Sequence, residues 1–287
     1  MPSIYTLKTD IYEKIKNDRK WFTPERSSSF SSNLEQALKT SSEERLPTLR
    51  LSKMGPCCPR QLWYSIHHPE LAEEIPGYAF IKFTYGHILE HLVIELAKAA
   101  GHEVCGEQDV LTVDGVKGHR DCVIDGCVVD VKSCSSRMFE KFKTKSISQD
   151  DSFGYLDQLD GYLVGSNEDS LVRVKDRGYI LAVDKTLGHI ELYEHRVRED
   201  SIRKRIEYYK QIVGRSTPPS CECGTIPDGK SGNVKLDVKA SYSPFKHSCF
   251  PHLRTFLYTS GPVYLTKVVR LPNVLEINKD GKIINGY

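Results

Sequence analysis

The chain has 287 residues, of which 39% are hydrophobic and 27% charged, as in a globular protein and unlike a disordered or fibrous one. The net charge of +2 combines 40 basic with 38 acidic residues, so any basic surface must arise from clustering rather than from excess. No apolar run reaches membrane-spanning length and the first residues lack a signal-peptide pattern, so we expect an intracellular, cytoplasmic protein.

The first third of the chain predicts mainly helices. Residues 3–17 place apolar side chains at helical spacing, and a serine-rich linker at residues 27–32 separates them from a short helix at residues 34–39. Pro59 suits the first turn of a helix that ends near residue 67, and residues 69–76 form a second linker. Residues 86–100 carry a broad apolar face that Gly101 ends, which predicts the strongest helix of the chain.

The middle of the chain predicts strands and then alternating helices and strands. Strands are expected at residues 104–107, 110–113, 120–124 and 127–131, and Asp125-Gly126 between the last two is a strong hairpin signal. Helices follow at residues 137–143 and 155–164, strands at 179–183 and 189–193, and a basic helix at 201–213. After a proline-rich boundary at residues 216–220, the tail is strand-rich, with a second hairpin expected at Asp280-Gly281.

This order of elements predicts an α/β fold with a small mixed central sheet flanked by helices. We expect three consecutive parts: an N-terminal helical segment (residues 1–75), a core (residues 76–215) and a cysteine-containing, strand-rich C-terminal extension (residues 216–287).

Acidic residues and one lysine fall at the centre of the predicted core. Asp130 and Lys132 share one face of their strand because side chains alternate along it. Together with Asp121, Glu90 and the backbone carbonyl of Val131, they offer oxygen ligands for one or two Mg²⁺ or Mn²⁺ ions. Such an ion activates water against a phosphodiester, and a lysine can orient that water and stabilise the developing charge.

Further polar residues could contact a nucleotide backbone. Gln158 and Tyr162 lie one turn apart on the same face of a predicted helix, and Arg120 and Arg60 are candidate phosphate contacts. The structural alternative for each residue is a solvated surface position or, for Tyr162, the core. Only their order along the chain favours a common site.

These residues resemble the motifs of the PD-(D/E)XK nuclease superfamily, in its RecB-like and lambda-exonuclease-like branch. The family's G-x-x-x-E, acidic-strand, (D/E)-x-K and Q-x-x-x-Y motifs resemble residues 86–90, 118–121, 130–132 and 158–162, in that order. The resemblance covers about residues 80–215 and implies a restriction-endonuclease-like core. Many RecB-like members carry a histidine where this chain has Glu90, which favours the lambda-exonuclease-like variant with Glu90 as a metal ligand.

The resemblance implies a Mg²⁺-dependent DNA exonuclease that acts at DNA ends in phage or other viral replication, recombination or repair, in the host cytoplasm if viral. DNA is the implied partner, with a single-strand annealing protein and further copies of the chain as additional partners to test, and no membrane. Two alternatives stay open: an endonuclease of junction-resolvase or restriction type, and a non-catalytic DNA-binding protein on a decayed nuclease fold.

Nine cysteines, an odd number, indicate buried thiols or metal ligands rather than disulfides in a reducing compartment. Residues 58–64 resemble the segment with which CRISPR-associated four-cysteine exonucleases donate the first thiolate to an iron–sulfur cluster. Cys58, Cys221, Cys223 and Cys249 could form a four-thiolate set on that pattern.

The spacing argues against an occupied cluster. Ala240 and Ser243 stand where the four-cysteine family has two of its ligands. A zinc site that includes His247 is a second alternative, although C-x-C is not a usual zinc spacing. We therefore expect the cysteine set to be a relic.

Overall fold

The computed structural model describes residues 2–42, 46–279 and 281–285, in two compact units. The larger unit consists of Met1–Gly55 and Pro76–Ile206, and the smaller unit of Pro56–Ile75 and Glu207–Tyr287. This division differs from the three consecutive segments expected from the sequence, because residues up to 55 belong with the core and residues 56–75 belong with the C-terminal extension. None of the described helices combines the length and the apolar character needed to cross a membrane.

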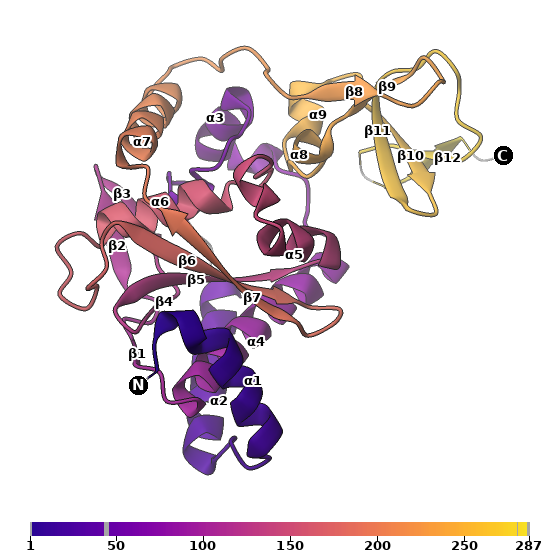
Figure 1. Ribbon diagram of the computed structural model, residues 1–287. Helices are drawn as coiled ribbons and strands as arrows, with labels where there is room; N and C mark the ends of the chain where they lie inside the picture. The colour runs from indigo at the N-terminus through magenta and orange to yellow at the C-terminus, as the bar shows by residue number, and fades with distance from the viewer. Residues whose placement is uncertain (1, 43–45, 280, 286–287) are drawn as a thin grey trace. The chain divides into compact units, whose positions relative to one another are not determined.

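The larger unit is built on a five-stranded mixed sheet in the order β1-β4-β5-β6-β7 (Figure 1). Its strands are β1 (Val104–Cys105), β4 (Cys122–Ile124), β5 (Cys127–Cys134), β6 (Arg177–Asp184) and β7 (Ile190–Arg196). The β5–β6 pair is parallel and the other pairs are antiparallel. The predicted α/β class with a small mixed sheet is confirmed.

The predicted hairpin joins β4 to β5 at the centre of this unit. Asp125 and Gly126 both have positive φ, 51° and 79°, as a two-residue type I′ turn requires. Ile124 pairs with Cys127 across the turn. Before the hairpin, β2 (Val110–Val113) and β3 (Val116–His119) form a separate two-stranded sheet, so the strand expected at residues 120–124 begins only at Cys122.

Helices cover both faces of the five-stranded sheet (Figure 1). The helices of the larger unit are η1 (Ile4–Thr6), α1 (Leu7–Asn17), α2 (Pro24–Ser42), η2 (Leu51–Lys53), α4 (Gly77–Ala99), α5 (Ser136–Lys143), η4 (Ser146–Ser148), α6 (Tyr155–Gly165) and the first part of α7 (Glu199–Val213). On one face, Leu7 of α1 and Ile94 of α4 are buried in one core cluster with Val129 and Leu181 of the sheet. On the other face, Leu159 and Leu163 of α6 lie against Gly178, where a Cβ would meet both side chains.

Two predictions about the N-terminal helices were wrong. The serine-rich linker at residues 27–32 is helical, inside α2, because its polar face has a partner: Ser29 Oγ donates to Glu95 Oε1 of α4 at 2.9 Å. Helix α4 begins at Gly77, well before residue 86. Its first turns carry exposed aromatic residues such as Phe80 and Phe83, so they lack the apolar–polar period that marks an amphipathic helix.

The smaller unit contains a six-stranded antiparallel sheet in the order β13-β12-β10-β11-β9-β8. Its elements are α3 (Pro59–His67), η3 (Pro69–Leu71), β8 (Thr225–Pro227), β9 (Val234–Leu236), α8 (Val238–Ser241), α9 (Lys246–Cys249), β10 (Arg254–Tyr258), β11 (Gly261–Lys267), β12 (Leu275–Ile277) and β13 (Ile283–Asn285). The strand-rich extension is thus confirmed. Asp280 of the second expected hairpin lies outside the described residues.

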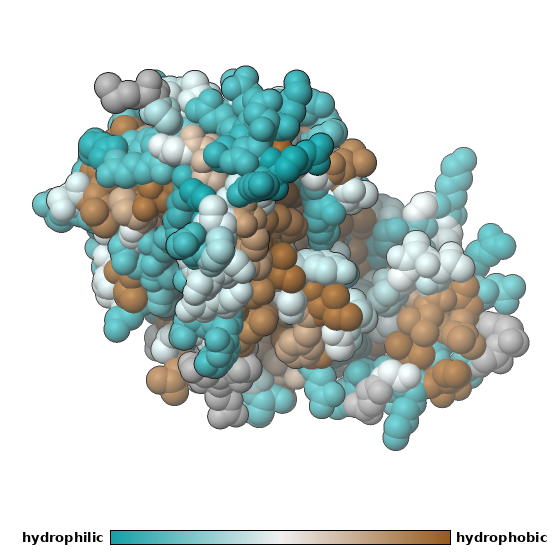
Figure 2. All heavy atoms as spheres, turned by 90° about the horizontal axis from the view of Figure 1, so that it is seen from below, coloured by the Kyte–Doolittle hydropathy of each residue, from teal (hydrophilic) through white to brown (hydrophobic). Residues whose placement is uncertain are grey.

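The smaller unit leaves part of its apolar surface uncovered. Phe256 and Leu265 are buried, whereas Leu257, Leu275 and Ile283 are exposed. Apolar atoms gather at the right of the space-filling view, over this sheet (Figure 2). A unit that buries little apolar surface gains little stability from a hydrophobic core and often relies on a metal site or disulfides.

Candidate functional site

Strand β5 carries a buried acid and a lysine on the same face. Asp130 is fully buried, and its Oδ2 lies 2.7 Å from Nζ of Lys132. The predicted common face of these two residues is therefore confirmed. Nζ of Lys132 also lies 5.6 Å from the ring centroid of Tyr155, at the start of α6.

Asp121 stands beside the same strand, immediately before β4. Its Oδ2 accepts a hydrogen bond of 2.7 Å from the backbone N–H of Val131. The carboxylate is thus attached to the residue between Asp130 and Lys132, and the hairpin brings the two acids together as expected.

Glu90 enters the site from α4. Gln108 Nε2 donates to its Oε1 at 2.7 Å. Burial raises the pKa of Glu90 to about 7, with a further contribution from Asp130 that Lys132 opposes. Burial also raises the pKa of Asp121 well above its ordinary value, and the charges of Glu90 and Asp130 add to this effect.

The site holds more acidic groups than its lysine can neutralise. Burial raises the pKa of Asp130 despite the opposing charge of Lys132. Burial by itself would lower the pKa of Lys132, but Asp130 and Asp121 raise it above its ordinary value, so the ammonium stays charged. The three carboxylates repel one another and have only the ammonium group of Lys132 as a counter-charge. Such a group is suited to bind a divalent ion, which would relieve the repulsion.

Helix α6 supplies the polar wall beside these acids. Gln158 Nε2 donates to the hydroxyl of Tyr162 at 2.7 Å and lies 3.4 Å from Oδ1 of Asp130. The Tyr162 side chain is only 3% exposed, and burial together with Asp130 raises the pKa of its hydroxyl. The two residues therefore share one helix face, as their spacing predicts, and that face meets the buried acid of β5.

Buried ion pairs that the sequence reasoning missed hold α6 in place. Asp160 is fully buried and lies 2.7 Å from Nε2 of His195, and it accepts a hydrogen bond of 2.8 Å from Nε of Arg198. Asp157 accepts from Arg205 at 2.6 Å. The sequence did hold a signal for these ion pairs. Asp157 and Asp160 lie three residues apart on the predicted helix and therefore share a face.

The assignment of Arg120 to substrate binding is wrong in this structure. Its side chain is fully buried and its guanidinium forms ion pairs with Asp109 at 2.6 Å and Asp169 at 2.5 Å. It also donates to the hydroxyl of Ser166. A guanidinium enclosed by its own carboxylates is not available to a phosphate.

Arg60 belongs to the smaller unit, on α3. Its Nε donates to the backbone carbonyl of Pro219 at 2.6 Å. This contact joins α3 to the segment that follows α7.

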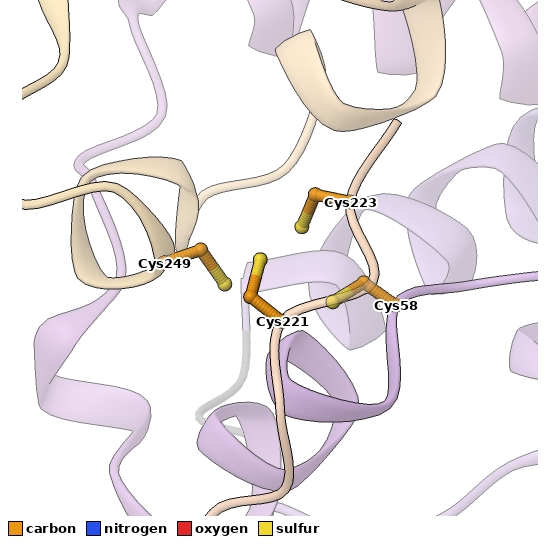
Figure 3. A group of neighbouring side chains, drawn as sticks. All are labelled: Cys58, Cys221, Cys223 and Cys249. Atoms are coloured by element: carbon orange, nitrogen blue, oxygen red, sulfur yellow. The ribbon is translucent and has the colours of Figure 1, made fainter. Parts of the chain in front are cut away.

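Four cysteines of the smaller unit converge on one point (Figure 3). The Sγ atoms of Cys58, Cys221, Cys223 and Cys249 all lie within 4.8 Å of one another. The four cysteines named from the sequence as a possible thiolate set therefore do converge, with Cys221 and Cys223 beside Cys58 and Cys249. None of the nine cysteines, all of which lie within the described residues, forms a disulfide.

Three separate segments deliver these sulfurs. Cys58 is the N-cap of α3, Cys249 is the last residue of α9, and Cys221 and Cys223 come from the loop before β8. Hydrogen bonds from the thiols of Cys223 and Cys249 lower the pKa of Cys58 well below its ordinary value.

His247, the alternative zinc ligand, is engaged elsewhere. Its Nδ1 contacts the carboxylate of Glu73, and that carboxylate also pairs with Lys246. The group of converging side chains that could hold a metal contains the four cysteines without it.

No family model and no curated protein matches the chain. Solved structures with distant similarity include the crystal structure of a protein designated SSO0001, at 16% identity and a TM-score of 0.41, over 79% of this chain and 97% of that one. An alkaline exonuclease from Laribacter hongkongensis matches at 14% identity and a TM-score of 0.42, over 59% of this chain and 88% of that one. The same exonuclease in complex with dAMP matches at 12% identity and a TM-score of 0.40, over 59% and 89%.

Proposed function

We propose that this chain is a Mg²⁺-dependent DNA exonuclease that hydrolyses phosphodiester bonds at DNA ends. The observation that carries the proposal is the gathering of three acids around one charged lysine. Glu90 lies on α4, Asp121 immediately before β4, and Asp130 on β5, where it pairs with Lys132 at 2.7 Å. In addition to burial, the charge of Asp130 raises the pKa of Glu90, and the charges of Glu90 and Asp130 raise the pKa of Asp121. Buried acids that repel one another are costly for folding, and they are typical of a site that binds a cation.

Each residue of the site has a proposed role. The carboxylates of Glu90, Asp121 and Asp130 and the backbone carbonyl of Val131 would hold one or two Mg²⁺ or Mn²⁺ ions, whose preferred ligands are oxygen atoms. A bound ion of this kind supplies an activated water and neutralises the leaving oxygen. Lys132, which keeps its proton, orients the attacking water and stabilises charge on the phosphate.

Gln158 and Tyr162 are proposed to position the DNA backbone. Both belong to the α6 face that meets Asp130, and Gln158 already donates a hydrogen bond in that direction. The resemblance to the lambda-exonuclease-like branch favours action at DNA ends, in recombination, repair or viral replication.

An endonuclease on the same fold is the first alternative. Linear duplex DNA and a covalently closed circle of the same sequence, each incubated with Mg²⁺, separate the two activities. We expect nucleotides to be released from the linear DNA while the circle stays intact. A circle nicked as fast as the linear DNA is degraded would favour the endonuclease.

A non-catalytic DNA-binding protein on a decayed fold is the second alternative. The complete set of acids with Lys132 speaks against decay of this site. Calorimetric titration with Mg²⁺ tests this point directly, with Asp121→Asn as the site variant and Asp114→Asn, in the turn between β2 and β3, as the matched control. We expect binding to wild type and to the control and its loss in Asp121→Asn. Absence of binding to wild type would favour decay.

A further inference from the structure

The four-cysteine centre of the smaller unit is a second metal-binding arrangement, apart from the carboxylate site. Its Sγ atoms lie within 4.8 Å of one another. A tetrahedral zinc ion with bonds of about 2.3 Å separates its four sulfurs by about 3.8 Å. A four-iron cluster separates the thiolates by roughly 6 Å, because four irons and their bridging sulfides lie between them. The observed spacing fits one ion and is too narrow for such a cluster.

We propose that Cys58, Cys221, Cys223 and Cys249 bind a single Zn²⁺ ion. Four thiolates complete the coordination of zinc and leave no open position for water or substrate, which is the pattern of structural zinc sites. The proposal does not rest on the nuclease function, since the four residues all belong to the smaller unit.

Hydrogen-bond donors already point at two of the sulfurs. The backbone N–H of Glu222 donates to Sγ of Cys58 at 3.3 Å, and Nε2 of Gln61 donates to Sγ of Cys223 at 2.8 Å. Zinc-bound thiolates keep negative charge and accept such bonds, which orient the ligands and tune the metal. These contacts therefore suit thiolates that share an ion.

The ligand set is a new combination rather than a damaged form of the four-cysteine pattern. Ala240 is buried and has no ligand atom, while the hydroxyl of Ser243 accepts a hydrogen bond of 3.1 Å from the N–H of Phe245. Cys221 and Cys223, which come earlier in the chain, supply the two remaining sulfurs. The side chain of Asp237 lies against Gly224, where a Cβ would come within 1.9 Å of its Oδ2, so the loop passes close to α8.

A zinc ion at this point would add a further link between segments that lie far apart in the sequence. It links the start of α3 to the loop before β8 and to the end of α9. The sheet of this unit leaves Leu257, Leu275 and Ile283 exposed, so its apolar core is limited. Metal binding to preorganised ligands contributes directly to folding free energy in such small units.

Metal analysis of the full-length chain tests the proposal. The chain is purified without oxygen from cells supplied with both iron and zinc, and its zinc, iron and acid-labile sulfide are then quantified. We expect one zinc per chain, no labile sulfide and no visible absorption. Four irons with labile sulfide would overturn the proposal. So would a metal-free chain, whether its four thiols react freely or are paired in disulfides.

Variants assign the ion to this centre. Cys223→Ser should lose the zinc, while Cys57→Ser should keep it, because Cys57 is exposed and lies outside the group although it adjoins Cys58. If Cys223→Ser does not fold, Cys221→His serves instead, since imidazole is also a zinc ligand. That variant should retain one zinc, and its cobalt-substituted form should show a shifted visible spectrum. An unchanged cobalt spectrum would place the metal elsewhere and overturn the assignment.

Discussion

The carboxylate of Asp121 accepts a hydrogen bond from the backbone N–H of Val131, with 2.7 Å between the two heavy atoms. This bond attaches an acid that lies outside any strand to the centre of β5. Asp121 should therefore contribute to stability through this hydrogen bond and to the proposed metal binding through its charge, and the two contributions can be separated.

Asp121→Asn and Asp121→Ala should separate these contributions. The amide oxygen of Asn can still accept from Val131, whereas Ala leaves that N–H without its partner. We expect both variants to lose Mg²⁺ binding, but only Ala to lower the free energy of unfolding, by about 1–3 kcal/mol. Urea denaturation in metal-free buffer measures the difference. Equal stability of the two variants would show that the hydrogen bond contributes little.

Glu90 should make the stability of the metal-free protein depend on pH. Its pKa is raised from 4.5 to about 7, so between these values the folded chain holds a proton that the unfolded chain has released. Stability therefore falls as pH rises through this window and levels off above pH 7. After allowance for solvent access the loss is on the order of 2 kcal/mol.

The matched comparison for this pH dependence is Glu90→Gln, which cannot ionise. As the pH rises from 4.5 to 7, Glu90→Gln should become progressively more stable than wild type. Mg²⁺ should reduce this difference in unfolding free energy, because it stabilises wild type. A difference that stays constant over this range would contradict the raised pKa.

Arg120→Met should damage stability rather than catalysis. Its buried guanidinium pairs with Asp109 and Asp169, so its loss leaves both acids without their partner. We expect the free energy of unfolding to fall by about 2–4 kcal/mol. At temperatures where the variant remains folded, its rate on linear DNA should match that of wild type. A rate loss in a stably folded variant would restore Arg120 to the substrate contacts.

Gly118→Ala should also act through packing. A Cβ at this position would lie 2.7 Å from the Cβ of Leu51, a fully buried residue. Overpacking of this kind costs about 1–3 kcal/mol. Gly77→Ala, at the start of α4, is the control because a Cβ there meets nothing within 4 Å. Thermal denaturation of the pair would show the difference, and equal melting temperatures would contradict the packing role.

The predictions that succeed are those that depend on neighbouring residues in the chain. The hairpin of β4 and β5 follows from Asp125-Gly126, because the turn type depends on two adjacent residues that tolerate positive φ. The common face of Asp130 and Lys132 follows from strand alternation, and that of Gln158 and Tyr162 from helix spacing.

Long-range contacts explain what the sequence does not predict. The helical state of residues 27–32 depends partly on Ser29 meeting Glu95 of a later helix. Arg120 is buried because Asp109 and Asp169 reach it from two other segments. The resemblance suggested Cys58, Cys221, Cys223 and Cys249 as a possible set, but their convergence depends on the fold of the smaller unit, and the C-x-C spacing does not establish it.

The most direct test of the proposed nuclease site is the Mg²⁺-dependent release of nucleotides from end-labelled linear DNA by wild type, Lys132→Ala and Lys143→Ala. Lys143 is an exposed lysine on α5 and serves as the matched control. We expect wild type and Lys143→Ala to degrade the DNA, and Lys132→Ala to lose activity by at least about 100-fold while its circular dichroism stays native. Undiminished activity in Lys132→Ala would contradict the proposed site.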